Sequence, residues 1–535
     1  MEETNLGEGT KKTHYVTEIA SESLEDLEEN VTSVVLNNEV PQGRHLGLFS
    51  TVNLFVSRII GGGIYAVPSS VFINCGGNIP LFLSVWIIAA IIAFIGMSIF
   101  LELGAALPRS GGRKNFLEVM FNKPWMMTTV MLCSFSILTC FAISPAIILG
   151  KYILYALGYD AHFVNEDSYA SNYIAIIAVI VIVLMHGLSL NHGILIQNFL
   201  GIIKFVIILI MCGTGTYVIL FYKNVNVETG ASSINTFNYF GFESTVSTAS
   251  IATAFIQCFY CFAGWDTVHN VTSEIKNPTR TLKLAGPLSL LIALICYLLL
   301  NIAYVKVLTY DEIQTAGPLI GSVLFTKLLG ESIGGKFIII SIILSAGSNL
   351  FVTIYGVSRM NQEVFREGLF PFSTTLSRNW PFTAPLPSLV VCGFVSCFWL
   401  SIIPNTGPAF DYVVSFEGYG NQIILLFVAI GLLFRKKCLQ SHDSTVVAPK
   451  IGIVIFVMFS FYLSIAPFIG KQAENSLTSL PPYPISALLL FLLSFLYWLF
   501  TFKVFPFVFG YTLKKKVVIQ EDGLEVFQWS KKKYI

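Results

Sequence analysis

The stretch FVSRIIGGGIYAVP, from Phe55 to Pro68, lies inside a long apolar run, where an α-helix is the expected structure. Three consecutive glycines, Gly61–Gly63, interrupt this run, and Pro68 follows five residues later. Glycine weakens a helix, and an unpaired backbone amide is costly where water cannot reach it. A chain that breaks a helix inside an apolar region therefore needs another partner for the freed amides and carbonyls.

The composition is that of a membrane protein. Of the 535 residues, 54% are hydrophobic and 12% are charged, and the mean hydropathy is +0.72. Soluble globular domains carry about 25% charged residues. The formal net charge of +1 also argues against a nucleic-acid partner, because proteins that bind nucleic acids present a basic face.

Apolar runs long enough to cross a bilayer core of about 30 Å recur along the chain. We predict twelve membrane-spanning helices, at 48–74, 79–103, 126–156, 172–190, 194–222, 246–270, 284–307, 335–360, 387–403, 410–434, 449–469 and 485–508. They form a transporter domain over residues 46–508. We expect residues 1–45, with the acidic stretch SESLEDLEEN, to form a disordered N-terminal tail, and residues 509–535 to form a C-terminal tail.

Lysine and arginine residues near the helix ends predict the orientation, because cytoplasmic loops carry an excess of them. If both tails are cytoplasmic, the outer loops hold only Lys223, Lys327, Lys336 and Lys471. The inner loops then hold a much larger set: Arg109, Arg113, Lys114, Lys123, Lys276, Arg280, Lys283, Arg359, Arg366, Arg378, Arg435, Lys436, Lys437 and Lys450. This imbalance and the even number of spans predict that both termini are cytoplasmic.

A second break is predicted in the sixth span, in QCFYCFAGWDTVHNVTSE (Gln257–Glu274), where Gly264 lies among aromatic and polar residues. Matched broken helices in the two halves of an inverted repeat are typical of secondary transporters. Spans 1 and 6 are equivalent positions of a five-plus-five repeat, with halves at about 48–222 and 246–434 and two further helices. We therefore predict an all-α polytopic fold with this inverted repeat.

Two broken helices suit a zwitterionic amino acid as substrate. Its carboxylate fits the freed amides of Gly61–Gly63, because a half-helix N-terminus attracts negative charge. Its ammonium group fits carbonyls near Ile59, Tyr260 and Cys261. Tight helix packing is the alternative reason for the glycines, since small residues let backbones approach closely.

At these residues the sequence resembles the L-type amino acid transporter branch of the amino acid–polyamine–organocation superfamily. Five segments carry the resemblance: IIGGGIY (Ile59–Tyr65), LELG (Leu101–Gly104), SGGRKNFLE (Ser110–Glu118), GWDTVHNVTSEIKNPTRTLK (Gly264–Lys283) and SRMNQEVFREGLFP (Ser358–Pro371). Within this branch, PQGRHLGLFSTVNLFVSRI, FYCFAGWDTVHNVTSEIKNP and GPLIGSVLFTKLLG are similar to fungal methionine permeases, and to the low-affinity type most closely. The resemblance covers about residues 40–535.

The resemblance implies the leucine-transporter-like fold, alternating access, and import of methionine across the plasma membrane with protons and without a cofactor. Related neutral or sulfur amino acids are further expected substrates. The substrate contacts that it implies come from both broken helices: Ile59, Gly61, Gly62, Gly63, Tyr260, Cys261, Ala263, Trp265 and Asp266. Asp266 has two open interpretations, a carboxylate of the pocket or of proton coupling, or a polar group satisfied within its own helix.

One departure from the branch concerns a protein partner. Animal L-type relatives are joined to a glycoprotein heavy chain through a cysteine in the loop after span 3. The corresponding loop here, Ala156–Ser171, contains no cysteine. We therefore expect no disulfide-linked heavy chain.

Lys204 lies ten residues into span 5, about 15 Å along the helix, and charged groups at this depth usually have a function. By resemblance to proton-coupled members, Lys204 occupies the region where sodium-coupled relatives hold an ion. Ser345 and Asn349 in span 8 are four residues apart, so they share one helix face next to it. We hypothesise that Lys204 replaces the sodium ion as a fixed or titrating charge. The alternative is a permanently paired lysine that braces spans 1, 5 and 8.

Other classes of function find less support. An enzyme is not expected, because the chain has no HExxH motif and the glycine run lacks the Lys-Ser/Thr of a phosphate loop; no metal site is indicated either. An amino acid exchanger and a nutrient sensor of the same fold, with a broader neutral amino acid range, remain as alternatives. Lys11 and Lys12 are candidate ubiquitin acceptors for a ubiquitin ligase, and an unmodified tail is the alternative.

Overall fold

A computed structural model describes the protein at residues 44, 46–107, 110–121, 124, 126–160, 163–164, 169–188, 190–222, 246–330, 335–380, 384–404, 407–439, 446–469, 481–519 and 525–533. The predicted N-terminal tail, with Lys11, Lys12 and the acidic stretch, lies outside these residues apart from Arg44.

The described chain is almost entirely helical, as the composition predicts. In chain order the longer helices are α2 (Leu48–Ile59), α5 (Ile79–Ala106), α7 (Met127–Thr139), α8 (Ile143–Ala156), α10 (Ala170–Leu188), α11 (Leu190–Phe221), α12 (Thr248–Phe262), α13 (Pro278–Val307), α16 (Lys336–Arg366), α18 (Leu386–Ile402), α19 (Gly407–Leu439), α20 (Lys450–Ile465) and α21 (Tyr483–Leu499). The shorter helices are α3 (Gly63–Ala66), α4 (Pro68–Asn74), α6 (Arg113–Met120), α14 (Tyr310–Ala316), α15 (Ile320–Leu329), α17 (Ser373–Leu376) and α22 (Phe505–Val508).

Within the described residues, ten segments are long and apolar enough to cross a membrane. Two of the twelve predicted spans are shorter. Span 9 is α18, an apolar helix of 17 residues, and span 6 begins with α12, which has 15 residues and then stops at the second break. Length alone therefore identifies ten crossings. It does not identify span 9 or the broken sixth span.

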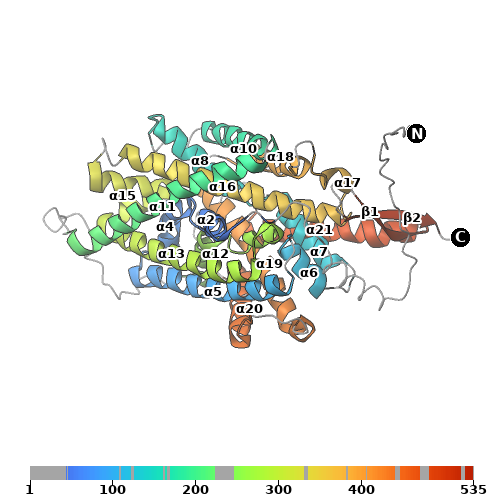
Figure 1. The fold of residues 1–535 in the computed structure, drawn as a ribbon. Coiled ribbons are helices and arrows are strands. Elements are labelled where there is room, and N and C mark those ends of the chain that lie inside the picture. Colours follow the sequence, from blue (N-terminus) through green and yellow to red (C-terminus); the bar gives the residue numbers. More distant parts are fainter. Residues whose placement is uncertain are drawn as a thin grey trace, which may run out of the picture.

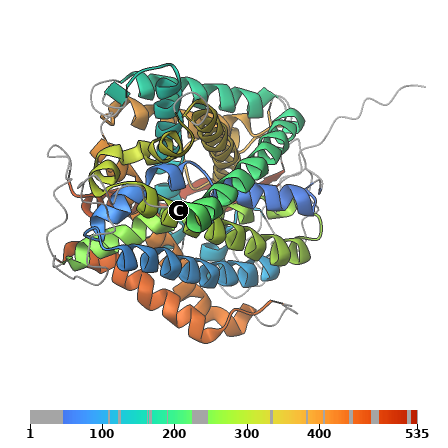
Figure 2. The same ribbon diagram turned by 90° about the vertical axis from the view of Figure 1, so that its left-hand side faces the viewer.

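Helix α20 lies at the edge of the bundle beside α5 in both views (Figure 1; Figure 2). Its side chains Ile451, Met458 and Phe461 are exposed, Ile451 to 77%. In water such a surface would be unstable, but lipid tails are equally apolar. This arrangement fits a bundle that is surrounded by a bilayer.

The two broken spans lie inside the bundle. Helix α2 contacts α11, α13 and α16, and α12 contacts α4, α5 and α19. Side chains from these neighbours can therefore reach both breaks.

Span 3 contains a third break, which the sequence analysis did not predict. Helix α7 ends at Thr139, Cys140 and Phe141 have left-handed backbone with φ of 54° and 48°, and α8 begins at Ile143. The physical reason is Pro145, which has no amide hydrogen for the carbonyl four residues earlier, that of Phe141. The predicted span 126–156 thus consists of two successive helices, α7 and α8.

The predicted C-terminal tail contains an unexpected β-hairpin. Strands β1 (Tyr511–Ile519) and β2 (Glu525–Lys533) pair antiparallel, with Lys515 opposite Trp529. The hairpin lies at one end of the bundle (Figure 1), where β1 contacts α22 and β2 contacts α16. There the Trp529 indole donates a hydrogen bond to the Glu367 carbonyl, 3.1 Å away, just beyond the end of α16.

Candidate functional site

The first break lies where the glycines predict it. Helix α2 ends at Ile59, Ile60 is extended with φ −86° and ψ 91°, and α3 starts at Gly63. Among the residues that the structure describes, the Gly61 and Gly62 amides donate to no backbone carbonyl. The break therefore presents free amide donors inside the bundle.

The glycines are also required for close packing. A Cβ atom on Gly61 would lie 2.8 Å from the Asn349 side chain, and one on Gly63 would lie 3.1 Å from the Cys261 sulfur. A Cβ atom on Gly62 would collide with Ile148 of α8. Close packing, the alternative reason for the glycines, thus favours glycine at the same three positions, and their role in binding a ligand stays a prediction.

The second break follows α12. Ala263 is extended, with φ −65° and ψ 155°, and Gly264 has φ +114°, a conformation that L side chains rarely adopt. A 3₁₀ segment then runs from Thr267 to Glu274. A Cβ atom on Gly264 would collide with the Arg58 side chain, so the two breaks touch through Arg58.

Tyr297 of α13 bridges the two breaks. Its hydroxyl lies 2.8 Å from the Ile59 carbonyl oxygen and 2.9 Å from the Cys261 carbonyl oxygen, and it can donate to one of them at a time. These are two of the carbonyls that the sequence analysis reserved for a substrate ammonium group. Tyr297 was not predicted from the sequence, because a single tyrosine in an apolar helix carries no distinguishing pattern.

The three predicted coupling residues meet at the end of α2. The Lys204 ammonium group, which is 1% exposed, donates to the Ser57 carbonyl at 2.9 Å, and the Asn349 amide donates to the same oxygen at 3.1 Å. The Ser345 hydroxyl donates to the Gly61 carbonyl at 3.4 Å. A positive charge at a helix C-terminus is favourable, so this geometry stabilises the break. Their role in coupling stays a prediction.

Asp266 is buried and forms an ion pair with Arg113 of α6. Arg113 also lies over the Phe141 ring at the third break, 5.3 Å from its centroid. The sequence analysis placed Arg113 in a cytoplasmic loop and did not pair it. The partner of Asp266 thus comes from another helix and not from its own, and a role of Asp266 in the pocket or in coupling stays a prediction.

A cavity of about 20 Å³ lies between the second and third breaks. The predicted residues Tyr260, Ala263 and Asp266 line it, together with Arg58 and Glu417. A cavity of this size holds about one water, so an amino acid requires the surrounding helices to move apart.

The other predicted contacts do not line this cavity. Ile59, the three glycines and Cys261 belong to the breaks themselves. Trp265 packs instead on α5, with its ring 5.1 Å from that of Phe100 and its edge against Gly96. Among the described residues, no group of three His, Cys, Asp or Glu side chains could hold a metal ion.

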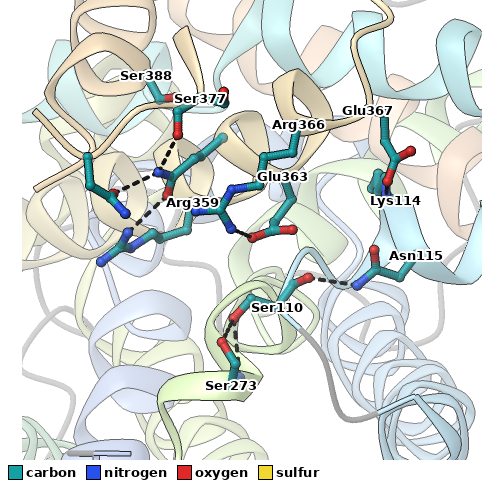
Figure 3. Close-up of polar contacts among 12 residues, drawn as sticks. Ser110, Lys114, Asn115, Ser273, Arg359, Glu363, Arg366, Glu367, Ser377 and Ser388 are labelled. Atoms are coloured by element: carbon teal, nitrogen blue, oxygen red, sulfur yellow. Dashed lines mark hydrogen bonds and ion pairs between the residues drawn. The ribbon is translucent and has the colours of Figure 1, made fainter. Parts of the chain in front are cut away.

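A network of ion pairs surrounds the C-terminal end of α16, where the Trp529 indole contacts Glu367, and Figure 3 shows part of it. Lys114 of α6 pairs with Glu118 and with Glu367, and Arg366 pairs with Glu363. Nearby, Arg359 pairs with Glu274 at 3.1 Å, and the Tyr355 hydroxyl donates to Glu274 at 2.6 Å. The charged residues of this network lie in segments that carry the family resemblance, but none of their pairs was predicted from the sequence.

Known proteins of similar sequence are amino acid permeases and transporters. A family model described as amino acid permease matches residues 46–510. The low-affinity methionine permease of Saccharomyces cerevisiae is 49% identical over 92% of this chain and 89% of its own length. The high-affinity methionine permease of the same yeast is 29% identical over 91% and 84%. The b(0,+)-type amino acid transporter 1 of Mus musculus is 25% identical over 97% and 96%.

The matched family and these relatives are transporters, and the helical, lipid-exposed bundle with broken central helices is a transporter architecture. The expectation that the chain is not an enzyme is therefore confirmed. The chain belongs to the amino acid permease family.

Proposed function

We propose that this protein imports methionine, and related neutral or sulfur amino acids, across the plasma membrane by alternating access in symport with protons. The observation that carries this proposal is the meeting of two broken helices, where the Gly61 and Gly62 amides are free and Tyr297 bridges the Ile59 and Cys261 carbonyls. The similarity to two yeast proteins named as methionine permeases supports the choice of substrate.

In the proposed binding mode, the substrate carboxylate accepts hydrogen bonds from the Gly61–Gly63 amides. The ammonium group donates to the Ile59 and Cys261 carbonyls, each of which has a second lone pair beside the one that faces Tyr297. The Tyr260 side chain bounds the pocket for the unbranched side chain. The substrate thereby satisfies backbone groups that a continuous helix would pair internally.

The proposed topology has twelve spans, with α18 and the broken sixth span added to the ten long segments. The first ten form a five-plus-five inverted repeat, and both termini are cytoplasmic. Breaks in spans 1 and 6, five spans apart, support the repeat.

Lys204 acts in this proposal as a fixed positive charge where other transporters place sodium. Its contact with the Ser57 carbonyl holds the end of α2. The same contact also favours an alternative function, an exchanger, because a lysine that only braces spans 1, 5 and 8 moves no proton. Transport measurements separate the two.

The test is uptake of radiolabelled methionine in cells that lack their own methionine transport, at pH 5 and pH 7, with unlabelled amino acids as competitors. Saturable uptake that is faster at pH 5 and is competed best by methionine supports the proposal. Uptake that ignores pH and requires internal amino acid indicates an exchanger. Surface expression without uptake indicates a sensor and refutes transport.

A further inference from the structure

Glu417 is a buried acid that the sequence analysis did not single out. It lies in α19, nine residues after the start of the span Pro408–Phe434, which is about 14 Å along the helix. Glu417 is 2% exposed. An acidic group at this depth is costly and usually has a function, and the signal in the sequence was the glutamate in the apolar run VVSFEGYG.

The two oxygens of Glu417 have different surroundings. Oε2 accepts a hydrogen bond from the Ser144 hydroxyl, and the Ile143 and Ser144 amides in the first turn of α8 also interact with the carboxylate. Oε1 is buried and has no hydrogen-bond partner among the described residues. The third break thus builds a site for a carboxylate at a helix N-terminus and leaves one oxygen available.

Arg58 lies across the same cavity, in the last turn of α2. Its Nε atom is buried without a hydrogen-bond partner, and no direct ion pair joins it to Glu417, although both side chains are described. Arg58 immediately precedes the first break, so a movement of this half-helix changes the distance between the two charges. An opposite charge nearby favours the ionised carboxylate.

The other charged and titratable groups around Glu417 are identified by the structure. Arg113 and Asp266 line the cavity as an ion pair with each other, and Tyr260 of α12 and Cys140 at the third break lie near Glu417. With Arg113 and Asp266 paired, Arg58 is the cavity cation that is left to balance Glu417.

We propose that Glu417 binds and releases the coupling proton, with Arg58 as the counter-charge that links protonation to the position of the first broken helix. When Arg58 is close, Glu417 releases its proton to water in the cavity. When the half-helix carries Arg58 away, Oε1 takes up a proton and the cavity keeps its charge balance. This inference rests on the proposed proton-coupled transport and assigns the proton to a residue other than Lys204.

The test uses the full-length protein in proteoliposomes, with two measurements for each variant. One is accumulation of radiolabelled methionine driven by a pH gradient of one unit, acidic outside, which for one proton per substrate supports at most about tenfold accumulation. The other is counterflow, the exchange of labelled for unlabelled methionine without a gradient, which requires no net proton movement.

The variants are Glu417→Gln, which resembles the protonated acid, and Glu417→Asp, which keeps a titratable group. The matched control is Glu102→Gln. Glu102 is also a 2% exposed acid, but its Oε2 accepts from the Ala448 amide and it does not line the cavity. Glu417→Gln should keep counterflow and lose accumulation, Glu417→Asp should regain accumulation, and Glu102→Gln should keep both.

Gradient-driven accumulation by Glu417→Gln at the wild-type level would overturn the inference and leave the proposed function intact. Loss of counterflow together with accumulation in Glu417→Gln would also overturn it, because it would make Glu417 a structural or substrate-binding group. If the wild-type protein exchanges methionine but does not respond to the gradient, the proton-coupled function itself fails. The wild-type measurements therefore separate the two failures.

Discussion

The polar side chains at the broken helices and those of the ion-pair network near the hairpin have different kinds of partner. At the ends of α2 and α12, side chains contact backbone: Lys204 donates to the Ser57 carbonyl oxygen, and the Tyr297 hydroxyl lies between the Ile59 and Cys261 carbonyl oxygens. In the network, side chains contact other side chains, as in the pair of Arg359 and Glu274. The contacts at these helix ends therefore depend on where each helix stops. The contacts of the network depend on which side chains from distant segments come together.

This difference has a consequence for mutation. A backbone acceptor cannot be removed by substitution, so the breaks are sensitive to backbone conformation and to the donors that contact them. The network can lose a charge on either side, and the partner that remains is then buried without compensation. Three substitutions test this difference, and a fourth removes a charge from a partly exposed ion pair outside both regions.

Gly264→Ala should have the largest effect. The residue has φ +114°, which costs about 1–3 kcal/mol for a residue with a side chain, and the new Cβ atom would collide with Arg58. Methionine uptake should be lost, measured per copy of protein at the cell surface. The control is Gly347→Ala in α16, where the nearest atom to a new Cβ is 3.9 Å away, and it should transport normally. Equal uptake by the two variants would contradict the account of the second break.

Glu274→Gln tests the network. It leaves the Arg359 charge buried without its partner, and breaking a buried pair in this way costs about 3–5 kcal/mol. The midpoint of thermal unfolding in detergent should fall clearly, while Tyr355 keeps an acceptor. The double variant Glu274→Gln with Arg359→Met should recover part of the loss. A double variant less stable than Glu274→Gln would show that the pair is not the source of the effect.

Tyr297→Phe removes the hydroxyl that bridges the two breaks. The loss leaves buried carbonyl groups with fewer donors and should cost about 1–3 kcal/mol. Uptake should fall without being abolished, because a bound substrate can donate to the same carbonyls. The control is Tyr419→Phe, which also removes a hydroxyl that donates to a carbonyl, that of Ser464, but away from the breaks. A similar loss of uptake in both variants would remove the special role of Tyr297.

Glu312→Gln should have the smallest effect. Burial raises the pKa of Glu312, but hydrogen bonds from Lys327 and Thr309 outweigh this and hold the pKa below its usual 4.5. A lowered pKa means that the stabilisation is present at neutral pH and is lost as the pH falls through the folded value. The pair is partly exposed and contributes about 0–1 kcal/mol.

Glutamine can still accept the hydrogen bond of the Thr309 capping box, so this substitution removes only the charge. The unfolding midpoints of the wild type and Glu312→Gln should differ slightly at pH 7, and the difference should shrink as the pH falls below 4.5. A difference that stays constant as the pH falls would show that the charge is not its cause.

The sequence predicted the parts of the fold that single residues determine. Gly61–Gly63 and Gly264 marked both central breaks, because glycine weakens a helix at a depth where water cannot replace the lost hydrogen bonds. Pro145 lies just after the third break and lacks the amide hydrogen that a continuous helix needs, but the break was not predicted from it. Apolar length predicted the spans, and only α18 and the broken sixth span fall short of it.

The remaining parts of the site depend on contacts between distant residues. Arg113 and Asp266 are 153 positions apart, and the loop position of Arg113 gave no sign that it is buried beside a break. Glu417 had no visible partner until Ser144 was placed next to it by the break in span 3. Such pairings require the three-dimensional packing of helices, which one sequence does not encode in any local pattern.

In the proposed binding mode, backbone groups at the two breaks hold both ends of an amino acid. Competition of methionine uptake by three analogues tests this binding mode: norleucine, which keeps both charged groups and loses the sulfur, 4-(methylthio)butanoate, which lacks the amino group, and 3-(methylthio)propylamine, which lacks the carboxylate. We expect norleucine to compete and neither single-group analogue to compete. Competition by either single-group analogue as strong as that by norleucine would contradict it.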